Sequence, residues 1–261
     1  MTDDLLLLTT DDRPAGRIAT VSFNNPDKRN ALGREGKKRL IEMLNELSRD
    51  DELRVVVLTG VGDTAFVGGA DLSEMTAYDP ARGYAAATIT HLTCQAVRDV
   101  PVPVIARING YCFGFGMELA AACDLRVAVD DAKLGMPETR FGIPSGMEAC
   151  LLPMLVGWGK ARELVLTGDH IGAAEAYRIG FLERIAPRDG LDAAVEGWID
   201  SILKCGPVVT RAQKTLVQDW EKLSVSDSIE AGIRAFARSF ETDEPKRMIE
   251  AFLNRRKARH G

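Results

Sequence analysis

The chain has 261 residues and a net charge of −5, with apolar and charged fractions typical of a folded globular protein. This length allows one large domain or two modest ones, and the negative charge argues against binding to the phosphate backbone of nucleic acids. The apolar run at residues 5–8 is too short for a signal peptide or membrane span, and acidic residues flank it. We therefore expect a cytoplasmic protein with no nucleic-acid or membrane partner.

The first two thirds of the chain alternate between strand and helix patterns. Residues 5–10 and 17–24 predict two strands joined by a turn, and residues 34–50 place Leu40, Leu44 and Leu47 on one helical face. Further strands are predicted at 54–60, 101–109 and 125–130, and helices at 72–75 and 80–99. Alternating strands and helices indicate an α/β fold with parallel strands.

From residue 191 onward the pattern is helical throughout. Four helices are predicted, at 191–203, 207–223, 224–240 and 244–258. We therefore expect a core domain over residues 1–190 and a helical region over 191–261. Short apolar helices of this kind often need a partner surface, which favours oligomerisation.

Cysteines and histidines give no sign of a metal or disulfide framework. The five cysteines include no CxxC pair, which favours reduced core thiols. His91, His170 and His260 are scattered without ligand spacing, so we expect no metal site and no catalytic triad. Residues 60–65 (GVGDTA) resemble a dinucleotide fingerprint, but a loop follows them where the fingerprint requires a helix.

Two glycine-containing loops follow predicted strands and end where helices begin. They are AFVGGADLSEM (residues 65–75) and NGYCFGFGMEL (residues 109–119). Backbone N–H groups at a helix N-terminus lack intrahelical partners and, with the helix dipole, favour negative charge. Two such termini brought together would form a cradle for an oxyanion. The alternative is that the glycines only make tight turns between strand and helix.

Two carboxylates lie in or after the second loop. Glu118 falls in the first turn of an otherwise apolar helix, MELAAAC, where a buried carboxylate is costly unless it is used or paired. An acid is also common at that position because the helix dipole favours it. Glu138, in GMPETRFGIP, is either a second acid of the same pocket or a surface acid paired with Arg140. The residue patterns alone leave these alternatives open.

Several motifs in order resemble the enoyl-CoA hydratase family, whose fold is called the crotonase fold. Besides the two loops, they are NNPDKRNAL (24–32), PETRFGIP (137–144) and LTGDHIGAAEAYRIGFLERI (166–185), so the resemblance covers essentially the whole chain. It implies an α/β spiral of ββα repeats with a C-terminal helical region that builds trimers, usually paired as hexamers. It also implies an acyl-CoA thioester as ligand, with no separate cofactor because coenzyme A is part of the substrate.

The resemblance also implies the roles of the site residues. The backbone N–H groups of Ala70 and Phe115 would form the oxyanion hole, and Glu118 and Glu138, twenty positions apart, would hold a water molecule. The expected reaction is syn addition of water across the 2,3 double bond of an enoyl-CoA. We expect Glu118 as the base that activates water and Glu138 as the proton donor, although the two roles are open to exchange.

Further residues would contact coenzyme A, by the same resemblance. Gly69, Asp71, Leu72 and Ser73 match the loop along the CoA arm, and Lys28 and Ala31 match the early loop near its nucleotide. Phe252 and Lys257 would reach the CoA of a neighbouring copy, although Lys257 also fits a solvated helix end.

The sequence departs from the family pattern at two places. The usual triple glycine is GFG here, so the Phe115 ring is expected to narrow or reshape the acyl pocket. Met147 and Glu148 replace two small residues, and Glu148 is either a third carboxylate near the pocket or a cap of the helix after Ser145. Two alternatives to hydration therefore stay open: another crotonase reaction (isomerisation, dehydration or thioester hydrolysis), and CoA binding without catalysis. Retention of both acids favours hydration.

Overall fold

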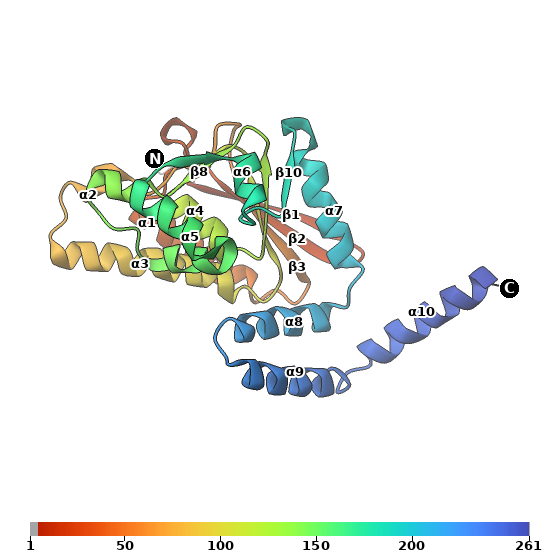
Figure 1. Ribbon diagram of the computed structural model, residues 1–261. Helices are drawn as coiled ribbons and strands as arrows, with labels where there is room; N and C mark the ends of the chain where they lie inside the picture. Colours follow the sequence, from red (N-terminus) through yellow and green to blue (C-terminus); the bar gives the residue numbers. More distant parts are fainter. Residues whose placement is uncertain (1–4, 261) are drawn as a thin grey trace.

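The computed structural model describes residues 5–260, and the side chains of residues 257–260 lie outside the description. Two sheets form its centre (Figure 1). In spatial order the first sheet contains β1 (Leu6–Arg13), β2 (Gly16–Phe23), β3 (Leu53–Gly60), β5 (Val104–Ile108), β7 (Leu125–Val129) and β10 (Arg184–Ala186). The second contains β4 (Ala65–Val67), β6 (Tyr111–Phe113), β8 (Lys133–Gly135) and β9 (His170–Gly172).

Each repeat of the chain contributes one strand to the first sheet and the next strand to the second sheet. β3, β5 and β7 pair in parallel in the first sheet, and β4, β6 and β8 do so in the second. Each pair is followed by a helix, so the chain repeats a ββα unit three times. These repeats confirm the expected spiral, and the parallel pairing of β2, β3, β5, β7 and β10 confirms the expected parallel strands.

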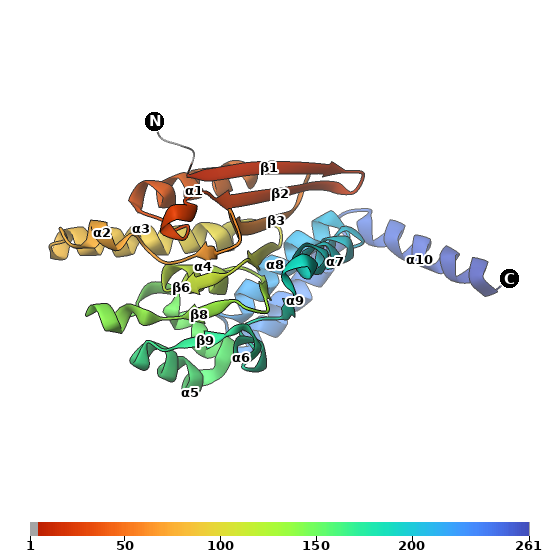
Figure 2. The same ribbon diagram turned by 90° about the horizontal axis from the view of Figure 1, so that it is seen from above.

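Helices pack around the repeats (Figure 2). The α-helices of the core are α1 (Arg34–Leu47), α2 (Leu72–Met75), α3 (Pro80–Asp99), α4 (Phe115–Ala122), α5 (Leu152–Thr167) and α6 (Ala173–Arg178). Short 3-10 helices are η1 (Pro26–Lys28), η2 (Pro137–Phe141), η3 (Met147–Leu151) and η4 (Arg188–Gly190).

The core lies between the sheets and these helices. Every residue of β3 is buried, as its continuous apolar run predicts for a strand covered on both faces, and every residue of α4 is buried as well. A fully buried Leu or Met side chain stabilises the fold by about 2 kcal/mol, so Met117 and Leu119 anchor α4 firmly. Of the five cysteines, Cys94, Cys112 and Cys123 are buried as expected, but Cys150 and Cys205 are exposed.

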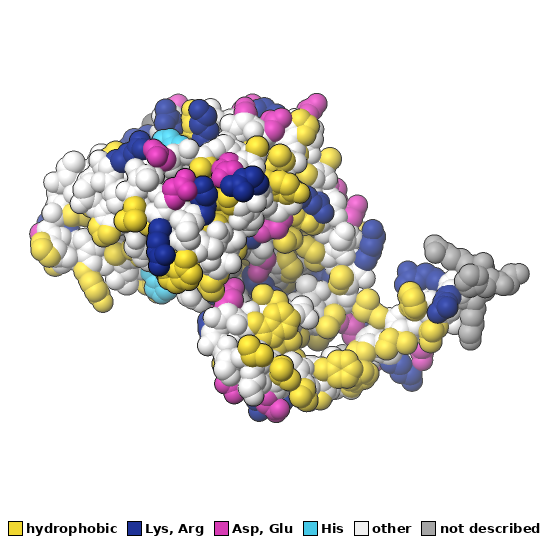
Figure 3. All heavy atoms as spheres, in the orientation of Figure 1, with side chains coloured by type: hydrophobic (Ala, Val, Ile, Leu, Met, Phe, Trp, Pro, Cys, Tyr) yellow, Lys and Arg dark blue, Asp and Glu magenta, His cyan; other side chains and the backbone are white. Residues whose placement is uncertain are grey.

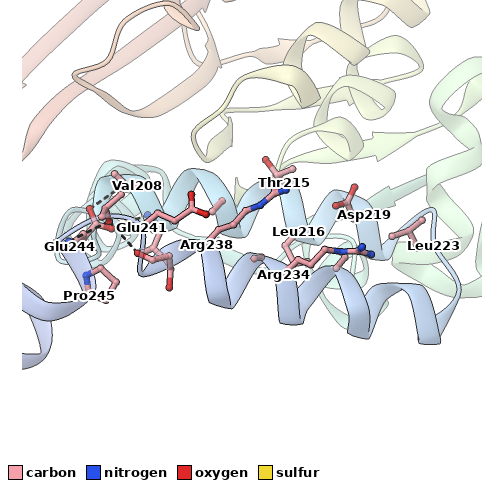
Figure 4. Close-up of a pocket in the computed structure, with 16 residues that line it drawn as sticks. Val208, Thr215, Leu216, Asp219, Leu223, Arg234, Arg238, Glu241, Glu244 and Pro245 are labelled. Carbon is pink, nitrogen blue, oxygen red and sulfur yellow. Dashed lines mark hydrogen bonds between the residues drawn. The ribbon is translucent and has the colours of Figure 1, made fainter.

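The C-terminal part is helical, as the sequence predicts. It contains α7 (Leu191–Leu203), α8 (Pro207–Trp220), α9 (Val225–Ser239) and α10 (Glu244–His260). Figures 1 and 2 show α10 extending away from the rest of the molecule. The buried Glu244 ties the start of α10 to the N-terminus of α8, where its carboxylate accepts hydrogen bonds from the N–H groups of Val208 (3.1 Å) and Val209 (2.9 Å) (Figure 4).

Large apolar side chains are exposed on the last two helices. On α9 they recur about once per turn: Ile229, Ile233, Phe236 and Phe240 at its end. Figure 3 shows apolar side chains along this part of the molecule. A cavity of about 580 Å³ lies between α8 and α9, lined in part by Val208, Leu216 and Leu223 (Figure 4).

None of the helices described is both long and apolar enough to cross a membrane.

Candidate active site

Three neighbouring parallel strands bring the predicted site loops to one place. β4, β6 and β8 lie side by side in the second sheet and run in the same direction. The loop after β4 carries Ala70, α4 after β6 carries Phe115 and Glu118, and η2 after β8 carries Glu138. Because the carboxyl ends of parallel strands meet at one edge of a sheet, Ala70 and Glu138, which are 68 positions apart in the chain, converge there.

The two amides predicted for the oxyanion hole lie on loops that touch. The start of α4 packs so closely on β4 that a Cβ atom on Gly116 would lie 2.1 Å from the carbonyl oxygen of Val67. A Cβ on Gly69 would lie 3.6 Å from the carbonyl oxygen of Phe113. Phe115 is the first residue of α4, where an N–H has no intrahelical acceptor. Ala70 immediately precedes the N-cap of α2, so both amides lie where strand gives way to helix.

Glu118 is buried, with 3% of its surface exposed. Its Oε1 accepts a hydrogen bond from the backbone N–H of Ala149, 3.1 Å away. Burial raises the pKa of Glu118 to about 8, and the negative charges of Glu138 and Glu148 act in the same direction. The Ala149 N–H and the Lys37 ammonium oppose that rise but do not cancel it. Burial and the neighbouring carboxylates thus favour the protonated form of Glu118.

Glu138 is half-buried in η2 and lies against the N-terminus of α4. Its Oε1 is so near the N-cap of that helix that a Cβ on Gly114 would lie 2.6 Å from it. Its Oε2 accepts a hydrogen bond from the hydroxyl of Ser145 at 2.7 Å. Arg140, the alternative partner considered from the sequence, pairs with Asp169. The structure thus brings Glu118 and Glu138 to the same end of α4.

A buried lysine, Lys37, lies against the Phe115 ring and was not among the residues predicted for the site. Lys37 on α1 has its ammonium 4.4 Å from the centroid of that ring and donates to the Thr90 hydroxyl at 2.7 Å. The ring is buried in the core beneath this ammonium, an outcome that the GFG motif alone does not predict. Burial lowers the pKa of Lys37 to about 8. Lys37 shares the helical face of Leu40 and Leu44, and this spacing was the available signal.

Glu148 proves to be a buried carboxylate near Glu118 and not a helix cap. The N-cap of η3 is Gly146, which makes no side-chain cap bond. The Oε1 atom of Glu148 lies 2.6 Å from Nδ1 of His91 on α3. The sequence alone gives no sign of a partner for His91, because α3 and η3 meet only in the folded chain.

The residues predicted along the CoA arm adjoin one another, with two exceptions. Lys28 forms an ion pair with Asp71 at 2.9 Å, and the N–H and hydroxyl of Ser73 donate to the other oxygen of Asp71. The N–H of Leu32, next to Ala31, donates to the carbonyl of Gly69, and Leu72 follows as an exposed first residue of α2. Phe252 is exposed on the projecting α10 and does not join this group, and the side chain of Lys257 lies outside the described part.

Comparison with known proteins agrees with this architecture. A model of the enoyl-CoA hydratase/isomerase family matches residues 13–261, and the chain belongs to that family. The chain is 31% identical over 243 residues to a short-chain-enoyl-CoA hydratase of Clostridium acetobutylicum, covering 93% of both proteins. It is also 31% identical to a crotonyl-CoA hydratase of Syntrophomonas wolfei, covering 93% of this chain and 94% of the relative.

Solved structures agree in fold. An enoyl-CoA hydratase of Bacillus anthracis superposes with a TM-score of 0.90 at 30% identity, covering 95% of this chain and 96% of that one. An enoyl-CoA hydratase of Mycobacterium smegmatis gives a TM-score of 0.92 at 27% identity, covering 97% of both chains. The crotonase fold expected from the sequence is therefore confirmed.

Proposed function

We propose that the protein is an enoyl-CoA hydratase that adds water in syn fashion across the 2,3 double bond of an enoyl-CoA thioester. The observation that carries the proposal is the pair of carboxylates, Glu118 and Glu138, held at one end of α4 beside the amide of Phe115. Relatives that share the fold bear hydratase names, which supports the same reaction class.

The chemistry follows from charge that develops during the reaction. As water adds to C3, negative charge grows on the thioester oxygen. The N–H groups of Ala70 and Phe115 would donate to that oxygen, and one such fixed donor lowers the barrier by about 3 kcal/mol. One glutamate takes a proton from the attacking water, and the other glutamate delivers a proton to C2, which completes the addition.

The electrostatics of the site favour an exchange of the two glutamate roles expected from the sequence. Because burial raises the pKa of Glu118 to about 8, its protonated form is favoured at neutral pH, and in this proposal it serves as the proton donor. Glu138, fixed by Ser145, then takes the proton from water. Such a pair, with one carboxyl protonated and the other ionised, is suited to combined acid and base catalysis.

The substitutions Glu118→Gln and Glu138→Gln test the reaction, with crotonyl-CoA as substrate and loss of the enoyl absorbance as the signal. Each should reduce kcat by about 100-fold or more, because amides neither donate nor accept the proton. Glu35→Gln, an exposed acid of α1 paired with Lys38, is the matched control and should turn over normally. Near wild-type turnover in both site variants would remove the hydratase proposal. Migration of the double bond without hydration would point to isomerisation.

We also infer that residues 191–261 form an oligomerisation region that builds a homotrimer or a dimer of trimers. The exposed row of Ile229, Ile233 and Phe236 on α9 supports this, since monomeric proteins rarely expose a contiguous apolar patch of this kind. Phe252 on α10 would then face the CoA site of a neighbouring copy. Light scattering of the intact chain should give three or six times the monomer mass, and Ile233→Glu should lower it. A monomeric wild type would refute the inference.

A further inference from the structure

Lys37 is a buried ammonium group that the proposed mechanism does not use. It is 5% exposed, on the face of α1 that also carries the buried Leu40 and Leu44. Burying an ammonium group costs free energy, whereas an apolar side chain would fill a core position of this kind without that cost. The contacts of Lys37 show what this cost maintains.

Two contacts hold the Lys37 ammonium. The first is with Thr90 on α3, which is also buried and accepts a hydrogen bond from Nζ at 2.7 Å. The Thr90 hydroxyl donates its own proton to the carbonyl oxygen of Ala86 at 2.9 Å, so it presents a lone pair to the ammonium. The second contact is with the Phe115 ring, whose centroid lies 4.4 Å from Nζ, within the range of a cation–π interaction. Helices α1, α3 and α4 therefore meet at one ammonium group.

The peptide group between Gly114 and Phe115 supplies the N–H proposed for the oxyanion hole. Its carbonyl oxygen, that of Gly114, accepts hydrogen bonds from the N–H groups of Met117 (2.8 Å) and Glu118 (3.0 Å), so it points into the first turn of α4. The C=O and N–H of a trans peptide group point in opposite directions. The Phe115 N–H therefore points away from the helix.

The Phe115 ring is the side-chain anchor of this peptide group. The residue on the other side of the group is a glycine, Gly114, which has no side chain to restrict its orientation. The ring is attached to the same Cα as the N–H, and a shift of the ring would tilt the N–H with it. A displacement of about 1 Å is enough to reduce catalysis strongly when a group must meet a reacting atom.

We propose that Lys37 is a positioning residue of the oxyanion hole: its ammonium, held by Thr90, fixes the Phe115 ring and thereby aims the Phe115 N–H at the thioester oxygen. The inference rests on the proposed function, which gives this N–H its role. Lys37 is buried and acts through Phe115, so in this role it needs no contact with the substrate.

The substitution Lys37→Met tests the inference, because it removes the ammonium and keeps an unbranched side chain. Binding of two CoA thioesters is measured by calorimetry. Acetoacetyl-CoA ionises to an enolate and so resembles the charge that develops in the reaction, whereas butyryl-CoA stays neutral. In Lys37→Met the Kd of acetoacetyl-CoA should rise about tenfold and that of butyryl-CoA by no more than about twofold. A general loosening of the structure would weaken both.

Turnover of crotonyl-CoA should change in the same sense. In Lys37→Met, kcat should fall about tenfold while KM stays within about twofold, because the N–H interacts most strongly with the charge of the transition state. Lys38→Met, on the exposed face of the same helix, is the matched control and should change neither kcat nor either Kd. Equal weakening of the two thioesters in Lys37→Met, or no weakening of either, would overturn the inference.

A double-mutant cycle separates positioning through the ring from the long-range effect of a positive charge. Phe115→Leu keeps the N–H and an apolar core side chain but removes the face of the ring. Lys37→Met should then add little to Phe115→Leu, because both variants break one contact. Full additivity of their effects on acetoacetyl-CoA binding would mean that the charge acts without the ring, and it would overturn the inference.

A further variant keeps the test decisive if Lys37→Met does not fold. Thr90→Val removes the acceptor that holds the ammonium and keeps the shape of the side chain. It should weaken acetoacetyl-CoA binding by a smaller factor than Lys37→Met and leave butyryl-CoA unchanged. An unchanged Kd for acetoacetyl-CoA in Thr90→Val would then count against the inference.

The binding measurements require no turnover, so they separate the two proposals. A protein that binds both thioesters but does not hydrate crotonyl-CoA would remove the proposed function, and the dependence of enolate binding on Lys37 could still be measured. A hydratase whose enolate binding ignores Lys37 would keep its function and lose this inference. A protein that binds neither thioester would lose both.

Discussion

The carboxylate of Glu118 and the backbone N–H of Ala149 are joined by a hydrogen bond of 3.1 Å between α4 and η3. This bond fixes one oxygen of Glu118 inside the protein, where burial and two neighbouring carboxylates raise its pKa to about 8. The backbone contact therefore positions the carboxyl, while the surrounding charges decide whether it carries a proton. The position of the Glu118 carboxyl and its protonation therefore depend on different neighbours, and each can be tested separately.

The first prediction concerns the pH dependence of hydration. If protonated Glu118 is the proton donor, kcat/KM for crotonyl-CoA should fall about tenfold per pH unit above about pH 8, because kcat/KM reports the free protein. Initial rates between pH 6 and 10 measure this limb. A profile that rises through pH 8 would instead assign Glu118 the role of base, as the sequence first suggested.

The second prediction concerns stability. The folded-state pKa of Glu118, about 8, lies above its ordinary value of 4.5, so the folded chain binds more protons than the unfolded chain between these pH values. The stabilising contribution of this group is fully present below pH 4.5 and is lost as the pH rises to about 8. Glu118→Gln should remove this loss, so it should unfold at higher urea concentration than wild type at pH 8.5.

The same variant should be almost inactive, so stability and activity should change in opposite directions. Urea unfolding of Glu118→Gln and wild type at pH 5 and pH 8.5 provides the comparison. The difference in unfolding free energy should be larger at pH 8.5. An equal difference at both pH values would show that Glu118 titrates normally in the folded protein.

The third prediction concerns Lys37. Its folded-state pKa, about 8, lies below the ordinary 10.5, so the unfolded chain binds more protons and stability rises with pH between about 8 and 10.5. Lys37→Met should abolish this rise. It should also move the high-pH limb of kcat/KM upward, because the ammonium no longer favours ionised Glu118. Lys38→Met, on the exposed face of the same helix, is the control and should change neither property. A downward shift of the limb in Lys37→Met would contradict the prediction.

Sequence periodicity predicted most of the fold, because buried parallel strands and amphipathic helices each have a recognisable pattern. The fully apolar run at β3 and the helical spacing of Leu40, Leu44 and Leu47 on α1 are clear examples. Glu118 was also found from its apolar surroundings. Lys37 lies on the same face as those leucines, so its burial was predictable from spacing, although a charged residue is ordinarily assigned to solvent.

The contact between His91 and Glu148 could not be predicted from the sequence, for a different reason. The two residues are 57 positions apart, and they meet only because η3 packs against α3. The left-handed backbone at Met147 turns Glu148 inward, and residue identity gives no sign of it because methionine rarely adopts that conformation. Contacts of this type depend on tertiary packing and on local strain, neither of which has a periodic signature.

The last prediction concerns Gly114, the N-cap of α4. Its φ of 52° and ψ of −119° belong to a region that only glycine adopts readily, and a Cβ there would lie 2.6 Å from Oε1 of Glu138. Gly114→Ala should therefore cost about 2 kcal/mol of stability and also push the Glu138 carboxylate from its place, with a loss of kcat of about 100-fold.

Gly62→Ala is the matched control: its φ is also positive, at 76°, but no atom lies within 4 Å of the added Cβ. It should lose about 1 kcal/mol of stability and keep its kcat. Urea unfolding and initial rates on both variants separate backbone strain from displacement of Glu138. Equal losses of activity in the two variants would mean that strain alone is responsible and that Glu138 does not depend on the absent side chain at position 114.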